Sequence, residues 1–262
     1  MKEIPIYQVD AFTHGPFTGN PAAVCVLTEP VTADTMQQIA MENNLSETAF
    51  ITRGSNEWLI RWFTPETEVD LCGHATLASA SVVLNILAPQ SNEVIFRSRV
   101  MGHLTVRRRG DMLELDFPSD TLRECELPPI IAESLGTKPM ECHMGRSDYL
   151  LLYGTEEDIL ALKPDFRMLA GIESRGVIAT APGKDVDFVS RFFCPGVGID
   201  EDPVTGSAHT TLIPFWSERL KKDQLTARQL SSRGGYLECS LRGDRTLIAG
   251  RAVLYLKGEI YA

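Results

Sequence analysis

The sequence predicts an α+β protein made of two similar halves, each with several short strands and one central helix. Short strand-like segments recur along the whole chain, and helical patterns are few. Two short motifs recur about half a chain length apart, which indicates an internal duplication. Two helical segments, 73–87 and 206–219, are rich in small residues, and the first is apolar on nearly every face. Such a helix is typically enclosed by other elements.

The composition is that of an ordinary globular protein. The chain has 262 residues, with 44% hydrophobic and 23% charged residues, which excludes collagen, coiled coil and wholesale disorder. The net charge of −10 argues against a nucleic-acid binder. No leader-like start and no apolar run of membrane-spanning length is present. We therefore expect a cytoplasmic protein with reduced thiols and no membrane partner.

The first half is expected to contain two helices among its strands. The helix over 32–43 starts near Thr32 or Asp34, because both are good N-caps and apolar residues follow on one face. A hairpin is expected around Gly54. The expected strands are 4–10, 22–27, 48–53, 57–63, 94–97, 103–109 and 112–117.

The second half repeats this order of elements. A short helix is expected over 156–162 and the small-residue helix over 206–219. The expected strands are 149–153, 176–181, 188–193, 224–230, 236–241 and 247–256. The last of these either closes the second half or returns to the first.

The repeat is also visible in the residues themselves. Arg-Trp-Phe-Thr-Pro at 61–65 matches Arg-Phe-Phe-Cys-Pro at 191–195, and Gly-His-Ala at 73–75 matches Gly-Ser-Ala at 206–208. The offsets of 130 and 133 residues are both close to half of the chain. Coincidence is the alternative, since the motifs are short. We expect domains at 1–118 and 119–262, with an active site in the cleft between them.

Each half brings a loop to the start of its small-residue helix, at Gly73 and Gly206. The first turn of a helix offers free N–H groups and the positive end of the helix dipole, which suit an anion. A small carboxylate between two such helix starts is the expected ligand. The alternative is that each glycine only permits tight packing of its helix.

Ionisable residues gather near these loops. Cys72 and His74 lie at the first helix start, and Asp202 and Ser207 lie at the second. Glu47 stands at the entrance to the strand over 48–53. A carboxylate in a partly dry cleft has a raised pKa and can transfer protons. The alternative for Glu47 is a solvated residue at a strand edge.

Four segments resemble the signature segments of the PhzF-like family, the relatives of phenazine-biosynthesis protein F. These segments are 14–21, 46–50, 70–76 and 201–209, and they occur in the family's order over nearly the whole chain. More distantly the chain is similar to diaminopimelate epimerase. That resemblance implies two pseudo-symmetric halves, each a curled sheet or barrel wrapped around a central helix.

The resemblance also implies roles for individual residues. Glu47 matches the family's general acid/base, while His74, Asp202 and Ser207 match residues that line the cleft and assist proton transfer. Gly73 and Gly206 match the helix-opening glycines, and Asn20 falls in the first signature segment.

The related racemases use a cysteine at each helix start. This chain has Cys72 at the first and Thr205 at the second, so a one-carboxylate mechanism through Glu47 is favoured over a two-thiol mechanism. Cys72 is then either a second proton donor or an inert buried thiol.

These observations together predict an isomerase that moves a proton on a small anionic substrate, without a cofactor or a metal. A homodimer is implied by the resemblance alone. The alternative is a non-catalytic binding or interaction module on the same fold. A thiol hydrolase built on Cys72 with His74 or His209 is disfavoured, because no orienting asparagine is evident. The histidines and cysteines have no recognisable metal spacing.

Overall fold

The computed structural model describes residues 2–262, which form two compact units. The first unit consists of two segments, the chain up to Phe117 and the C-terminal segment Ile248–Ala262. The second unit is Pro118–Leu247. This division differs from the expected halves at the C-terminal end. The last strand belongs to the first unit because it pairs with the first strand of the chain.

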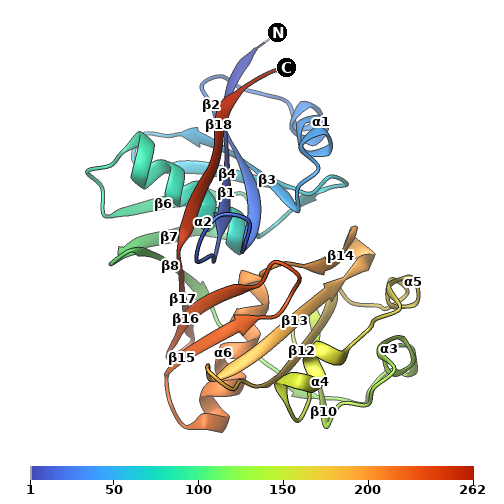
Figure 1. Ribbon diagram of the computed structural model, residues 1–262. Coiled ribbons are helices and arrows are strands. Elements are labelled where there is room, and N and C mark those ends of the chain that lie inside the picture. Colours follow the sequence, from blue (N-terminus) through green and yellow to red (C-terminus); the bar gives the residue numbers. More distant parts are fainter. Residues whose placement is uncertain (1) are drawn as a thin grey trace. The chain divides into compact units, whose positions relative to one another are not determined.

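The first unit is a curled sheet in which strands far apart in the sequence lie side by side (Figure 1). Pairing runs in the order β18, β1, β2, β3, β4, β6 and β7, then β8, and β5 also pairs with β4. The strands are β1 (Glu3–Ala11), β2 (Asn20–Leu27), β3 (Glu47–Arg53), β4 (Trp58–Phe63), β5 (Glu68–Val69), β6 (Glu93–Ser98), β7 (Gly102–Arg109), β8 (Met112–Pro118) and β18 (Ala252–Tyr261).

The central helix of this unit is α2 (Gly73–Val82), which continues as a π-helical segment, η1 (Val83–Leu87). All ten residues of α2 are buried, and the helix contacts β1, β2, β3 and β18. This confirms the helix expected over 73–87. The second helix, α1 (Ala33–Asn43), is capped by Thr32, whose side chain accepts the N–H of Thr35.

The second unit repeats this plan. Its sheet pairs β9, β10, β11, β12, β13, β15 and β16 in that order, and β14 also pairs with β13. The strands are β9 (Arg123–Glu124), β10 (Glu141–Met144), β11 (Asp148–Leu152), β12 (Gly176–Pro182), β13 (Phe188–Cys194), β14 (Ile199–Asp202), β15 (Gln224–Gln229) and β16 (Gly235–Arg242). The next strand, β17 (Arg245–Gly250), begins in this unit and ends in the first one.

The central helix of the second unit is α6 (Gly206–Leu220), which contacts β15 and β16. Its inner face buries Leu212, Ile213 and Trp216, and the Trp216 ring stacks on Phe188 of β13. The smaller helices are α3 (Pro129–Leu135), α4 (Glu156–Ala161), α5 (Phe166–Leu169) and the 3₁₀ turn η2 (Pro195–Val197).

Equivalent ion pairs confirm that the two units are copies of one plan. Arg61 Nε lies 2.7 Å from Glu68 in the first unit, and Arg191 Nε lies 2.7 Å from Glu201 in the second. Each guanidinium also lies over a phenylalanine two residues further along its strand, at 5.1 and 4.8 Å. The strand connections agree too, since β2 and β3 are parallel, as are β11 and β12. The predicted duplication and fold class are therefore correct.

Several short elements were not predicted. These are β5, β9, β10, β14, α3, α5 and η2, and most have no more than four residues. The strand expected over 247–256 is two strands that break at Arg251.

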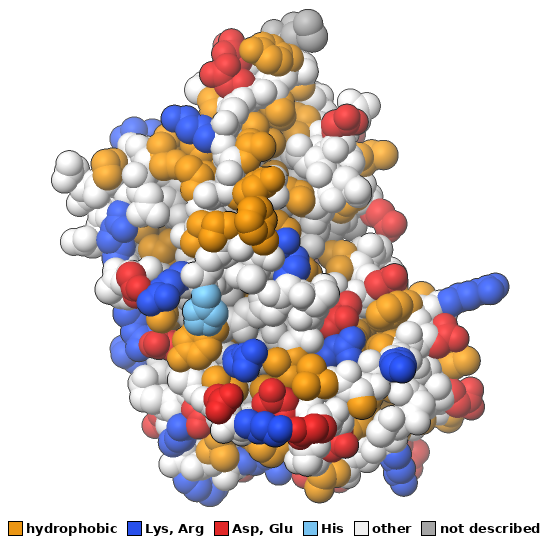
Figure 2. Space-filling model, in the orientation of Figure 1, with side chains coloured by type: hydrophobic (Ala, Val, Ile, Leu, Met, Phe, Trp, Pro, Cys, Tyr) orange, Lys and Arg blue, Asp and Glu red, His pale blue; other side chains and the backbone are white. Residues whose placement is uncertain are grey.

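The first unit exposes an apolar strip along β18. Leu254, Tyr255 and Leu256 are each about half exposed, and the exposed ring of Phe17 contacts Tyr255 edge-on. Figure 2 shows apolar side chains gathered over this strand. Among the described residues no helix has the length and apolar character needed to cross a membrane.

Candidate functional site

Four of the predicted site residues lie together in the first unit. Asn20 and Glu47 are the first residues of the parallel strands β2 and β3, while Cys72 is the N-cap of α2 and His74 its second residue. The ligand atoms of Glu47, Cys72 and His74 all lie within 4.8 Å of one another. The fold thus brings three of the separate signature segments to one place.

His74 is the centre of this group. Its ring Nε2 lies 3.1 Å from Glu47 Oε2, and the Asn20 side-chain amide lies 3.0 Å from Nδ1. Because the amide nitrogen can only donate, Nδ1 is the acceptor and the ring proton sits on Nε2, facing the carboxylate. Asn20 therefore fixes the histidine tautomer, and the imidazole lies directly beside Glu47.

Burial keeps His74 neutral. The side chain is only 3% exposed, and loss of hydration lowers the pKa of His74 to about 3. The 3.1 Å contact between His74 and Glu47 is thus a close approach of a neutral imidazole to the Glu47 side chain at ordinary pH. The Glu47 side chain retains 13% exposure, so its carboxylate is partly open to solvent.

Cys72 contacts the other side of the imidazole. Its Sγ lies 3.5 Å from His74 Nδ1. The two residues are two positions apart in sequence, a spacing that does not predict the contact. Cys72 is buried, with 5% exposure. One carboxylate oxygen, one thiol and one imidazole are a donor set that suits zinc. Sequence analysis placed all three residues at the candidate site but found no metal-type spacing among them.

In the second unit, Asp202 holds the loop that leads into α6. Its carboxylate accepts the hydroxyl of Thr205, and its backbone carbonyl accepts the Gln229 side-chain amide at 2.7 Å. Gln229 also accepts the N–H of Thr205 at 2.8 Å. Asp202 is 6% exposed. These contacts give it a structural role in placing the helix start, which sequence reasoning did not anticipate.

Ser207 contacts an arginine that sequence reasoning missed. Arg175 Nη1 lies 2.9 Å from Ser207 Oγ, and Arg175 Nε lies 2.8 Å from Asp148 Oδ1, with a second contact between Nη2 and Oδ2. Asp148 is 3% exposed, and its hydrogen bond raises the pKa of Arg175 despite burial. Since the guanidinium can only donate, the Ser207 hydroxyl is left to donate elsewhere.

His209 is fully buried in the same helix. Its Nδ1 lies 2.8 Å from the carbonyl of Thr205, and burial lowers the pKa of His209 to about 4. Its ring lies near that of Phe188. These contacts indicate a core histidine and offer no support for a thiol hydrolase built on Cys72 and His209.

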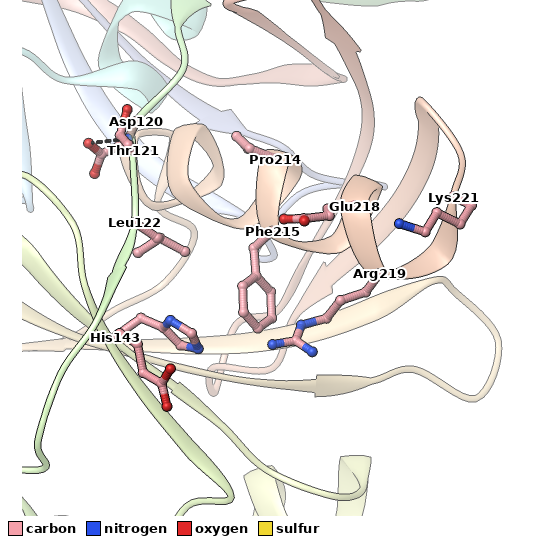
Figure 3. A pocket seen from close by; sticks show the side chains of 10 residues that line it. Asp120, Thr121, Leu122, His143, Pro214, Phe215, Glu218, Arg219 and Lys221 are labelled. Carbon is pink, nitrogen blue, oxygen red and sulfur yellow. Dashed lines mark hydrogen bonds between the residues drawn. The ribbon is translucent and has the colours of Figure 1, made fainter.

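A cavity of about 840 Å³ opens beside the outer face of α6 (Figure 3). Phe215 lies in its wall between His143 and Arg219, and the Arg219 guanidinium is 4.1 Å from the Phe215 ring centre. Glu124 and Glu218 add carboxylates to the lining. None of the predicted site residues lines this cavity, so its position does not support the proposed chemistry.

The helix-opening glycines are where the sequence places them. Gly73 and Gly206 are the first residues of α2 and α6. Each helix therefore begins close to polar side chains at the beginning of neighbouring strands. In the first unit this residue is Glu47, which begins β3. In the second unit the residues are Asp148, which begins β11, and Arg175, which directly precedes β12.

The fold and this arrangement define an α+β protein of two duplicated units, each a curled sheet around a central helix with polar side chains at the helix start. Residues 9–258 match the family model described as phenazine biosynthesis-like protein, PhzC-PhzF. The chain belongs to this family.

Similar proteins and solved structures also support membership of this family. The chain is 49% identical over 259 residues to an uncharacterised isomerase of Pseudomonas aeruginosa, with 99% of both chains covered. It is 41% identical to the mouse phenazine biosynthesis-like domain-containing protein 1, over 99% of this chain and all of that one. A PhzF-family crystal structure from Enterococcus faecalis superposes with a TM-score of 0.95 at 45% identity, covering both chains completely.

The likeness of the fold extends further. A probable proline racemase from Agrobacterium radiobacter has a TM-score of 0.68 at 10% identity, over 98% of this chain and 93% of that one. At this identity the likeness concerns the fold alone.

Proposed function

We propose that this protein is an isomerase that moves a proton on a small carboxylate-bearing substrate, with Glu47 as the acid/base and no bound cofactor. The observation that carries the proposal is the 3.1 Å contact between Glu47 Oε2 and the buried, neutral imidazole of His74. The names of close relatives as isomerases support the reaction class.

In the proposed reaction the Glu47 carboxylate takes a proton from an activated carbon of the substrate. The electron pair left behind spreads into the adjoining carbonyl or conjugated system, and Glu47 then returns the proton to another carbon or face. His74 lies beside the carboxylate on its Nε2 side and is itself held by Asn20. Because burial lowers the pKa of His74, the imidazole does not take from Glu47 the proton that Glu47 must return to the substrate.

Ser207 is proposed to bind the negative charge of the substrate. Its oxygen accepts from Arg175, so its hydrogen is available to an anion, and the N–H groups of the first turn of α6 add further donors. Asp202 acts indirectly in this scheme by holding Thr205 at the helix start. That one cleft serves both helix starts stays a prediction, as do the cytoplasmic location and the homodimer.

Cys72 is proposed to help position His74. Its Sγ lies beside Nδ1 of the imidazole, on the opposite side of the ring from the Glu47 contact. A thiol at this place supports the tautomer that Asn20 sets.

The test is solvent hydrogen exchange. The protein is incubated in deuterium oxide with a panel of small α- and β,γ-unsaturated carboxylates, and deuterium incorporation is followed by NMR and mass spectrometry. We expect incorporation at one carbon of at least one compound, abolished in Glu47→Gln. A ligand that binds tightly in calorimetry and never exchanges would instead support the binding-module alternative.

A further inference from the structure

Two cysteine side chains meet in the second unit, away from the residues proposed for catalysis. Cys125 follows the last residue of β9, and Cys142 lies in β10. Their Sγ atoms are 3.5 Å apart, and the Cys125 N–H donates to the Cys142 carbonyl at 3.0 Å. Both are thiols in this structure.

The backbone holds the two residues opposite each other. Glu124 faces His143 in the antiparallel pair of β9 and β10, so the next residue along, Cys125, faces Cys142. Directly opposite residues in such a pair project their side chains from the same face of the sheet. A disulfide requires sulfur atoms that converge, and in this register the two Sγ atoms lie 3.5 Å apart.

The two thiols differ in access to solvent. Cys142 is 7% exposed and packs in the apolar cluster with Leu151 and Tyr153, whereas Cys125 is partly exposed at the margin of that cluster. A reagent from solution therefore meets Cys125 first.

We propose that Cys125 and Cys142 form a dithiol site that hydrogen peroxide oxidises to a disulfide and that a dithiol reductant returns to two thiols, becoming a disulfide itself. The thiolate of Cys125 attacks the peroxide, the O–O bond breaks, and Cys125 becomes a sulfenic acid while one water leaves. The thiol of Cys142 then attacks the Cys125 sulfur, the S–S bond forms, and the hydroxyl leaves as a second water. Two thiols lose two electrons and two protons in total, and the peroxide accepts them.

The local environment supports this order of events. Burial and the neighbouring Cys125 raise the pKa of Cys142 to about 12, so Cys142 keeps its proton at ordinary pH. The Cys142 thiol can then donate a hydrogen bond to the Cys125 thiolate across the 3.5 Å gap. Cys142 acts as the resolving thiol once Cys125 is oxidised, because its sulfur is already in contact.

The disulfide would form beside the large cavity. Glu124, next to Cys125, and His143, next to Cys142, both line that cavity. The bond would close a loop of 17 residues in sequence separation, which restricts the unfolded chain and raises the midpoint of thermal unfolding of this unit.

The test uses the full chain, hydrogen peroxide as the oxidant, and peptide mass spectrometry without reduction. We expect wild type to yield a peptide pair joined through Cys125 and Cys142, lighter by two hydrogens, that separates on treatment with dithiothreitol. Cys125→Ser should give no joined pair. Cys142→Ser should leave Cys125 as a sulfenic acid that dimedone captures. Cys25→Ser removes another buried thiol, whose pKa burial raises to about 12, and should leave the joined pair unchanged.

The proposal is overturned if wild-type Cys125 and Cys142 stay reduced, join to other cysteines, or become separate sulfinic acids. The peptide mass spectra of the oxidised wild-type protein decide between these outcomes even if a serine variant fails to fold. A rise of several degrees in the unfolding midpoint after oxidation, reversed by reduction, is the second expected result.

Discussion

Gly176 occupies in the second unit the strand position that Glu47 occupies in the first. Each is the first residue of its strand, and the third residue after it faces the arginine of the repeated motif, Arg61 or Arg191. The duplicated fold therefore has one acid at this position, not two. The neighbouring Arg175 supplies a cation to Ser207, whereas the first unit presents a carboxylate to its helix start.

Gly176 cannot be replaced without strain. A Cβ at this position would lie 2.6 Å from the carbonyl oxygen of Phe193 and 2.7 Å from the Phe192 ring. We expect Gly176→Ala to lower the free energy of unfolding by about 1–3 kcal/mol through overpacking. Gly196→Ala is the matched control in the same unit, because its Cβ would meet only one atom at an ordinary 3.6 Å. Chemical denaturation of both variants measures the difference, and equal stabilities would contradict the explanation.

Glu47→Gln should abolish isotope exchange while leaving the fold intact. The amide keeps the shape of the side chain but cannot accept a proton, so we expect a loss of about 100-fold or more. Circular dichroism and thermal melting check that the variant is folded. Glu93→Gln removes a glutamate that is 52% exposed and paired with Arg107, and it should exchange at the wild-type rate. Wild-type exchange in Glu47→Gln would rule out Glu47 as the base.

Asn20→Asp should change the pH dependence of exchange. A carboxylate beside Nδ1 favours the protonated imidazole, whereas burial now keeps the pKa of His74 near 3. We expect the variant to lose exchange at neutral pH and to recover part of it as the pH rises. A profile of the wild-type shape, merely lower at every pH, would show that Asn20 does not act through His74.

Protein stability should fall as the pH drops below about 6.5, the ordinary pKa of histidine. Burial lowers the pKa of His74 to about 3 and of His209 to about 4, so the unfolded chain binds more protons than the native one in this range. Each histidine then contributes a loss of about 1.4 kcal/mol per pH unit until its folded pKa is reached. In His209→Gln the slope of unfolding free energy between pH 6 and 5 should be smaller by about this amount. An unchanged slope would contradict the neutral, buried state of His209.

Arg175→Met should be more damaging alone than together with a change in its partner. The single change leaves the carboxylate of Asp148, which is 3% exposed, without its cation and should cost about 3–5 kcal/mol. In Arg175→Met/Asp148→Asn the buried charge is gone, so part of that loss should return. Urea denaturation of the two single variants and the double variant measures the coupling energy. Additive effects would show that the pair is not coupled.

Prediction from the sequence succeeded for the features that depend on residues close together in the chain. The Arg-x-Phe-x-Pro motifs and the Gly-x-Ala helix starts recur about half a chain length apart, so the sequence motifs alone predicted the duplication. The Thr32 cap and the helix over 73–87 follow from local propensity and burial. Short strands such as β5 and β14 carry too few residues for a period to emerge.

Arg175 illustrates what sequence reasoning missed and why. It contacts Asp148 and Ser207 at separations of 27 and 32 residues, and no motif links the three. One signal existed, since the motif offset of 130 residues carries position 47 to Val177, two residues from Arg175. The contact between Cys125 and Cys142 likewise depends on strand register, which cysteine counting does not reveal.

By itself the sequence determined the two-copy plan, the enclosed helices and the segments that carry the reactive side chains, because these depend on neighbouring residues and on hydrophobic pattern. Only the tertiary structure decided which atoms meet. The tautomer of His74, the partner of Ser207 and the loss of a second acid follow from strand pairing between distant segments. Pairing of that kind is fixed by the packing of the whole sheet around its helix.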